Sequence, residues 1–273
     1  MRVLIIGGSG FLGTELIRQA VAAGHETIAT FTTRRPGPSP DVAWRHLDVR
    51  HAADVAGLIA DVAPSVVLNA SSGGAHWEVT ADGAAHVALS AARHGRRLVH
   101  VSSDAVFSGA RTHYDESCPP DPLTPYGAAK AAAETAVRHL APAAAVVRTS
   151  LIIGHGRSTH ERLVHALAVG SRAGVLFTDD IRCPVHVTDL AAALWELARS
   201  DAPGMFHLAG PDAVSRHELG VLIARRDGLD ATRHPTGLRT DAPHPGPLDV
   251  RLDSSATQRQ LRTRLRGARE FLG

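Results

Sequence analysis

Tyr126 and Lys130 are the two side chains whose types and spacing best suit proton transfer. They are four residues apart, which places them on one face of a helix. A phenol can give its proton to a carbonyl oxygen while hydride reaches the carbon, provided that a nearby cation lowers its pKa from about 10. Lys130 is the single lysine of the chain and Tyr126 is one of 2 tyrosines, so accident explains this spacing poorly. The pair therefore predicts a proton donor and the cation that tunes it.

Serine and asparagine side chains follow two of the expected strands. Ser102 and Ser103 close a strand at residues 98–102, and Asn69 lies near the end of a strand at 66–70. Open parallel sheets bind ligands at the edge where their strands end. A serine there can hold a substrate carbonyl for attack, although a serine pair is also ordinary turn chemistry. Asn69 is similarly either a site residue or a strand terminator.

Short apolar runs alternate with helical patterns through the first 150 residues. This order predicts an α/β fold, a Rossmann-type doubly wound parallel sheet with helices on both faces. We expect strands at residues 3–7, 27–31, 66–70, 98–102 and 144–148, and helices at 11–23, 52–62, 78–94 and 126–140.

The second half of the chain is less regular and predicts a smaller, loop-rich region. We expect helices at 161–172, 188–199 and 216–226, a strand at 205–209 and a final helix near 254–271. Ser215 and Glu218 have the spacing of a capping box. We divide the chain into a dinucleotide-binding domain, 1–153, that carries Ser103, Tyr126 and Lys130, and a mainly substrate-binding region, 154–273, parts of which return to the Rossmann core.

A glycine-rich turn comes directly after the first expected strand. Gly7, Gly10 and Gly13 form G-x-x-G-x-x-G just before a helix. Glycines at this spacing let backbone N–H groups approach a pyrophosphate, and the helix N-terminus adds partial positive charge. We expect cofactor contacts from this turn at Gly7, Gly10, Phe11, Leu12 and Gly13.

The end of the second strand bears on which dinucleotide binds. An acidic residue that would bind the ribose of NAD is missing there, and Arg34 and Arg35 occupy the segment instead. Two guanidinium groups suit a 2′-phosphate, so the sequence favours NADP(H), with NAD(H) as the alternative; a solvated basic loop would look the same. Asp48 and Val49, which come shortly before the helix expected at 52–62, are expected to contact the cofactor, with Asp48 facing the adenine, although a surface turn would also explain Asp48.

Composition excludes several classes of protein. Lys+Arg 29 against Asp+Glu 27, with no basic run longer than two, gives no footprint of a nucleic-acid binder. No apolar run approaches the roughly 20 residues of a membrane span. Two cysteines are too few for a disulfide framework, so we expect a cytoplasmic protein. His160 and His165 are five apart rather than one helical turn, so we expect no metal.

Taken together, the motifs resemble the extended short-chain dehydrogenase/reductases, and within them the dTDP-4-dehydrorhamnose reductase branch. The resemblance covers nearly the whole chain and rests on the glycine turn and on residues 69–72, 102–109, 122–130, 148–150, 182–191, 204–210 and 247–253. The chain departs from residues that are common in the branch at Ala105, at Ser71 and Ser72, and at Gly246, which weakens the inference about the substrate.

The resemblance implies roles for individual side chains. Ser103 stands at the family's catalytic Ser/Thr, Tyr126 is the proton donor, and Lys130 also contacts the nicotinamide ribose. Residues Asn69, Ala70 and Ser71 join the expected cofactor contacts. Ser103, Asp104 and Arg182 are the expected substrate contacts, where Arg182 either binds a substrate phosphate or holds a loop.

We therefore expect an NADP(H)-dependent ketoreductase whose partner is a small-molecule carbonyl compound, either a nucleotide-linked 4-keto sugar or a natural-product ketone. Two alternatives remain: a redox-neutral epimerase or dehydratase that retains NAD, and a non-catalytic subunit that senses a dinucleotide. We expect neither nucleic acid nor a membrane as a partner, and a homodimer is left open.

Overall fold

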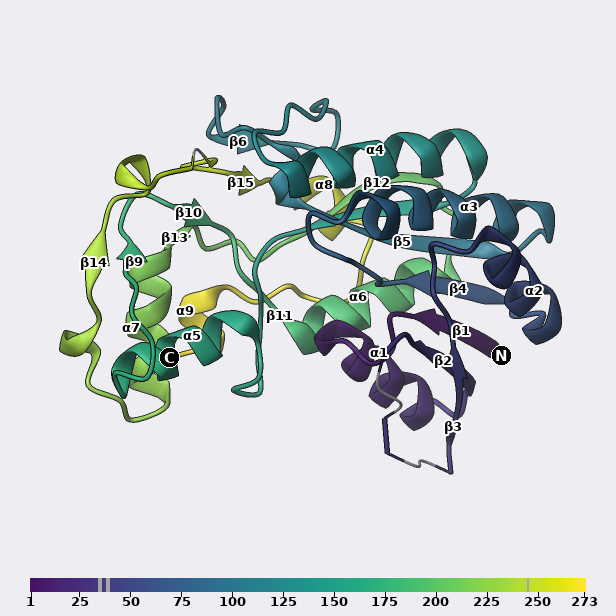
Figure 1. Cartoon of the computed structure of the whole chain (residues 1–273), viewed down its shortest axis with the longest axis horizontal. Coiled ribbons are helices and arrows are strands. Elements are labelled where there is room, and N and C mark those ends of the chain that lie inside the picture. Colours follow the sequence, from purple (N-terminus) through teal and green to yellow (C-terminus); the bar gives the residue numbers. More distant parts are fainter. Residues whose placement is uncertain (34–35, 38–39, 245) are drawn as a thin grey trace. The chain divides into compact units, whose positions relative to one another are not determined.

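The computed structural model describes residues 1–33, 36–37, 40–244 and 246–273, and Figure 1 shows their elements in chain order. The chain forms two compact units. The first unit contains Met1–Ser103, Pro125–Arg148 and Ala191–Phe206, and the second contains Asp104–Thr124, Thr149–Leu190 and His207–Gly273. The units interleave along the chain, whereas the sequence predicts a single boundary after residue 153. That division into functional domains stays a prediction.

A seven-stranded sheet forms the centre of the first unit, in the order β12-β7-β5-β4-β1-β2-β3. Its strands are β1 (Arg2–Ile6), β2 (Glu26–Phe31), β3 (Val42–His46), β4 (Val66–Asn69), β5 (Arg97–Ser103), β7 (Ala145–Thr149) and β12 (Gly204–Leu208). β1 pairs in parallel with both β2 and β4, with Ile6 opposite Asn69. Strand order reverses between β1 and β4, and in doubly wound sheets this switch point is where ligands bind. The predicted Rossmann-type fold is confirmed.

Helices pack on the sheet of the first unit. They are α1 (Phe11–Ala22), α2 (Ala52–Val62), α3 (Gly83–Arg93), α4 (Pro125–Leu140) and α6 (Val187–Arg199). Figure 1 shows α3 and α4 on one face of the sheet and α1 on the other. After the exposed Arg2, β1 is apolar because both faces of the sheet are covered, and Val3, Leu4 and Ile5 are 0% exposed. The helix expected at 78–94 begins as a π-helical turn, η1 (Glu78–Asp82), before α3.

The second unit contains α5 (Thr159–Ala168), α7 (Arg216–Arg226), two short C-terminal helices and several two-residue strands. The strands pair as β10 (Ile181–Arg182) with β13 (Val214–Ser215), β11 (Val185–His186) with β8 (Ile152–Ile153), β14 (Thr236–Gly237) with β9 (Leu176–Phe177), and β15 (Arg251–Leu252) with β6 (His113–Tyr114). Among the residues described, no helix is long and apolar enough to cross a membrane.

The expected capping box is only half formed. Ser215 Oγ accepts a hydrogen bond from Glu218 N at the start of α7, but the Glu218 carboxylate pairs with Arg269 instead of turning back. A complete capping box is found at α5, between Ser158 and Glu161. The hydrogen bond from Glu218 N to Ser215 Oγ joins residues three apart, so the sequence could predict it. The partner of the Glu218 carboxylate depends on which residues the tertiary structure brings near it.

The long final helix expected at 254–271 is wrong. The structure has two short helices there, α8 (Ser255–Gln258) and α9 (Ala268–Phe271). Between them, the Gln258 side chain donates to Thr263 O and accepts from Leu265 N, and Arg266 makes a two-point ion pair with Asp189. These tertiary contacts hold the segment in an irregular path despite its helical pattern.

Candidate active site

The glycine turn between β1 and α1 needs its glycines for space. Gly7 has φ +82°, and a Cβ there would lie 2.8 Å from Ser71 N. A Cβ on Gly13 would lie 2.2 Å from Gly7 O, so α1 can begin this close to the turn only without a side chain. Gly10 is the N-cap of α1, followed by half-buried Phe11 and buried Leu12. The turn therefore presents backbone N–H groups and a helix N-terminus at the switch point.

Thr30 on β2 supports this turn and was not predicted. Gly7 N donates to Thr30 Oγ1 at 3.1 Å, and Ser9 N donates to Thr30 O at 3.3 Å. The contact depends on β2 lying next to β1 in the sheet. It could be found only once the strand order was known.

Asn69 is held in place at the end of β4. Its side chain is 1% exposed, its Oδ1 accepts from Ser71 N and Ser71 Oγ, and its Nδ2 lies 3.2 Å from His100 Nδ1. Ala70 N continues the ladder by donating to Ile6 O. Residues 69–71 therefore lie against the glycine turn, as expected for residues that share a cofactor, and their role in binding stays a prediction.

Lys130 reaches from α4 to the end of β5. Its side chain is 3% exposed, and Nζ donates to Val101 O at 3.0 Å, two residues before Ser103. Tyr126 precedes Lys130 by about one helical turn and is half-buried. Burial lowers the pKa of Lys130 to about 8, while the nearby Glu134 carboxylate acts in the opposite direction. Helix and strand thus bring the predicted proton donor, its cation and Ser103 to one region of the first unit.

The two serines at the end of β5 have different surroundings. Ser102 is buried, and its Oγ donates to Glu134 Oε1 at 2.6 Å. Ser103 is half-buried on the last residue of the strand, and successive strand residues point to opposite faces. Ser102 therefore faces Glu134 inside the unit, and the role of Ser103 in holding a substrate carbonyl stays a prediction.

Of the residues predicted to contact the adenosine half of the cofactor, the structure describes Asp48 and Val49. Arg34 and Arg35 lie outside the described residues. Asp48 is bound by Arg50 through its Nε, Nη2 and backbone N, and these hydrogen bonds lower the pKa of Asp48 to about 2. Val49 O is hydrogen-bonded to His86 Nδ1 at 2.9 Å. Contact of Asp48 and Val49 with an adenine stays a prediction.

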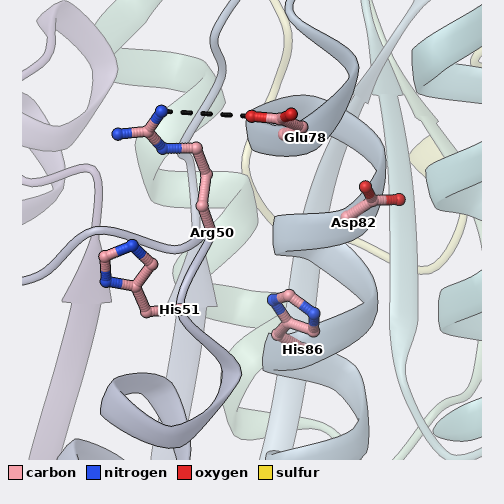
Figure 2. Close-up of a pocket in the computed structure, with 5 residues that line it drawn as sticks. All are labelled: Arg50, His51, Glu78, Asp82 and His86. Carbon is pink, nitrogen blue, oxygen red and sulfur yellow. Dashed lines mark ion pairs between the residues drawn. The ribbon is translucent and has the colours of Figure 1, made fainter.

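A polar pocket of about 380 Å³ lies beside the turn that contains Asp48 and Val49. It is lined by Arg50, His51, Glu78, Asp82 and His86. Figure 2 shows Arg50 extended toward Glu78 on η1, with 4.0 Å between Nη1 and Oε2. Arg50 and His86 are the same residues that hold Asp48 and Val49. The pocket mixes both signs of charge beside the turn predicted to contact adenine.

In the second unit, Arg182 is engaged by protein groups. It is 5% exposed, its Nη1 and Nη2 donate to Leu248 O and Pro247 O, and Nη1 lies 2.9 Å from Asp180 Oδ1 as an ion pair without hydrogen-bond geometry. Asp104 accepts from Ser150 Oγ at 2.6 Å. Substrate binding by Arg182 would require exchange of these contacts, so holding the 247–248 segment is its role in this structure. Substrate contacts by Asp104 and Arg182 stay predictions.

The first unit thus combines a turn shaped for a dinucleotide, a phenol, a buried ammonium and a hydroxyl at one sheet edge. A phenol beside an ammonium can donate a proton to a substrate oxygen, because the positive charge stabilises the phenolate that remains. A hydroxyl on the neighbouring strand end can orient that oxygen.

Comparison with known proteins identifies the family. A family model described as the RmlD substrate binding domain matches residues 1–272. The spore coat polysaccharide biosynthesis protein SpsK of Bacillus subtilis is 31% identical, over 84% of this chain and 80% of its own length. A dTDP-4-dehydrorhamnose reductase of Mycobacterium tuberculosis is 32% identical, over 90% and 82%.

A solved structure shares the fold. The crystal structure of dTDP-4-dehydrorhamnose reductase from Bacillus anthracis in complex with NADP superposes with a TM-score of 0.85 at 21% identity, covering 99% of this chain and 96% of that one. The chain therefore belongs to the RmlD substrate binding domain family of the extended short-chain dehydrogenase/reductases, and it is of their NAD(P)-dependent oxidoreductase type.

Proposed function

We propose that this protein is an NADP(H)-dependent ketoreductase that reduces a carbonyl on a small molecule, with a nucleotide-linked 4-keto sugar as the leading substrate class. One observation carries the proposal: the single lysine of the chain is buried beside the end of β5, one helical turn from Tyr126. A sensor of dinucleotides would not need a phenol and a desolvated ammonium together. The relative named dTDP-4-dehydrorhamnose reductase supports the substrate class.

The residues around the glycine turn fit a nicotinamide dinucleotide. A Cβ on Gly7 or Gly13 would clash with backbone atoms, so the turn is tight enough to bring its backbone N–H groups to a diphosphate, and residues 69–71 border it. Gly7, Gly10 and Gly13 would bind the diphosphate, while Asn69, Ser71 and Lys130 would contact the nicotinamide half. When bound, the reduced cofactor supplies the hydride.

The chain's own residues complete the reduction. Ser103 donates a hydrogen bond to the substrate oxygen and orients the carbonyl. Tyr126 gives its phenolic proton to that oxygen as hydride arrives at the carbon, which yields an alcohol. Lys130 stabilises the phenolate that is left until a proton returns from solvent.

NADP(H) is the proposed cofactor because the residues that follow β2 are Thr32, Thr33, Arg34 and Arg35, with the first carboxylate at Asp41. A test is the double variant Arg34→Ala/Arg35→Ala. Charge-assisted hydrogen bonds contribute roughly 1.5–3 kcal/mol each, so the affinity for NADPH should fall more than about 10-fold while that for NADH stays. An unchanged ratio of the two affinities would overturn the cofactor assignment.

Steady-state assays test the reaction. We expect purified protein to oxidise NADPH when given a dTDP-4-keto sugar, and to do so faster than with the same ketone lacking the nucleotide. Protein that carries tightly bound NAD(H) and consumes no NADPH over a panel of ketones would instead indicate a redox-neutral epimerase or dehydratase.

A further inference from the structure

Glu134 is the centre of a buried polar cluster behind the proposed proton donor. It lies on α4 with Tyr126 and Lys130, at successive intervals of four residues, so the three side chains share one face of the helix. Glu134 is 2% exposed and Lys130 is 3% exposed. A carboxylate this far from water is costly unless it is paired and hydrogen-bonded.

The partners of Glu134 come from two neighbouring strands. Arg148 on β7 makes a two-point ion pair, with Nε 3.0 Å from Oε1 and Nη2 2.8 Å from Oε2. Ser102 on β5 donates to Oε1 at 2.6 Å. Both oxygens are therefore engaged by groups other than Lys130, whose Nζ donates to Val101 O. The Glu134 carboxylate is therefore held one helical turn from Lys130. Among the described residues, its ion pair is with Arg148 and not with Lys130.

This arrangement acts on the charge of Lys130. Burial favours the neutral amine, and the nearby Glu134 carboxylate opposes burial, so the pKa of Lys130 lies at about 8 rather than lower. A lysine with that pKa is still about nine-tenths charged at pH 7. Loss of the carboxylate would leave burial unopposed and the positive charge of Arg148 no longer balanced by Glu134, and both effects favour the neutral amine.

Other groups around Lys130 do not replace Glu134. His100 on β5 is 1% exposed, and burial together with Lys130 lowers its pKa to about 3, so it is neutral at working pH. Tyr126 is the proposed proton donor, on which the charge of Lys130 acts. η1 and α3 also pack against α4, and the titratable side chains that they carry are Glu78, Asp82, His86, Arg93 and His94. Glu78, Asp82 and His86 line the pocket of Figure 2.

We propose that Glu134 is a positioning residue for the reduction: its carboxylate, oriented by Arg148 and Ser102, keeps the buried Lys130 side chain positively charged beside Tyr126. The catalytic part of this inference rests on the proposed function. The electrostatic part can be tested without turnover.

The single lysine makes a direct test simple. Protein grown with lysine labelled at ¹³Cε gives one side-chain resonance, whose pH dependence reports Lys130 alone. In Glu134→Gln, which keeps the shape of the side chain, we expect the midpoint of this titration to fall by about 1 unit or more. The double variant Glu134→Leu/Arg148→Met removes the whole ion pair and guards against a single variant that fails to fold. Its midpoint should lie between those of Glu134→Gln and the wild type.

Glu161→Gln is the matched control. Glu161 is a second buried glutamate, 0% exposed, paired with Arg226 at 2.8 Å in the other unit. Its loss should leave the Lys130 midpoint unchanged. If Glu134→Gln and the double variant both titrate like the wild type, or if Glu161→Gln gives the same shift, the inference is overturned.

Activity gives a second readout that a merely structural role would not move. With the midpoint lowered by one unit, about half of Lys130 is charged at pH 7, so kcat of Glu134→Gln should fall about 2-fold there and recover near pH 6. KM should change little. A kcat reduced equally at every pH contradicts the proposal, whereas wild-type protein that oxidises no NADPH overturns the proposed function and leaves the resonance titration as the test of Glu134.

Discussion

Replacing Lys130 by methionine should make the folded protein more stable and the enzyme nearly inactive. The reason is the lowered pKa of Lys130, about 8 in the folded chain against an ordinary value of 10.5. Stability rises with pH wherever the unfolded chain binds more protons than the folded one. Between pH 8 and 10.5 the unfolded lysine is protonated and the folded one is neutral, so stability is lost as the pH falls through this window.

The size of the effect follows from that difference. About 2.5 pH units at 1.36 kcal/mol per unit correspond to about 3 kcal/mol of lost stability at pH 7. Methionine has a similar length and no charge, but it leaves Val101 O without the hydrogen bond from Nζ, which costs about 1 kcal/mol. The net expectation for Lys130→Met at pH 7 is a gain of about 2 kcal/mol. Turnover should fall by about 10²–10⁴, the usual contribution of a positioned acid–base group.

Urea unfolding at pH 7 and pH 10 checks the expected gain in stability, and an NADPH oxidation assay checks the expected loss of turnover. At pH 10 the expected penalty on lysine is below about 1 kcal/mol, so the gain should disappear. Tyr126→Phe is the control, because it should lose turnover without gaining stability. A Lys130→Met variant that is less stable than the wild type at pH 7, or equally stabilised at both pH values, would refute the reasoning.

Three further outcomes follow from the same geometry. Tyr126→Phe should lower kcat by about 10²–10⁴ with little change in NADPH affinity measured by fluorescence; near-normal turnover would remove the phenol from the reaction. Turnover of the wild type should decline above about pH 8 as Lys130 loses its proton, and a profile that stays flat to pH 10 would contradict the requirement for its charge. Gly13→Ala should lower NADPH affinity at least about 10-fold, because the new Cβ would lie 2.2 Å from Gly7 O. Gly57→Ala on α2, where a Cβ meets nothing within 4 Å, is its control and should bind NADPH normally.

Much of the fold could be predicted because its signals are local. The apolar run of β1, the glycine turn and the start of α1 are consecutive in the chain, so spacing alone predicts a strand, a tight turn and a helix N-terminus. The same holds for Tyr126 and Lys130, whose interval of four residues places them together on any helix. Composition also singled out this pair, since an arginine-rich chain keeps its one lysine at that position.

Other features depended on contacts between distant segments. The expected helix at 254–271 is interrupted because Arg266 pairs with Asp189, 77 residues away. Ser102 and Ser103 look equivalent in the sequence, and the structure shows that Ser102 is buried and donates to Glu134 on α4, whereas Ser103 is half-buried. For Arg182 the sequence left two roles open, and the structure shows its guanidinium donating to backbone carbonyls of Pro247 and Leu248.

The sequence by itself determined which elements form and which chemical groups the chain carries, because helix spacing, strand alternation and turn chemistry act over a few residues. Tertiary structure alone decided which polar groups are buried and how they pair. Arg148, Ser102 and Glu134 come together only when β7, β5 and α4 pack, and that packing removes the water around Lys130 and sets its charge. Charge on a buried group depends on every neighbour within a few ångströms, and those neighbours are fixed by the fold rather than by adjacency in the chain.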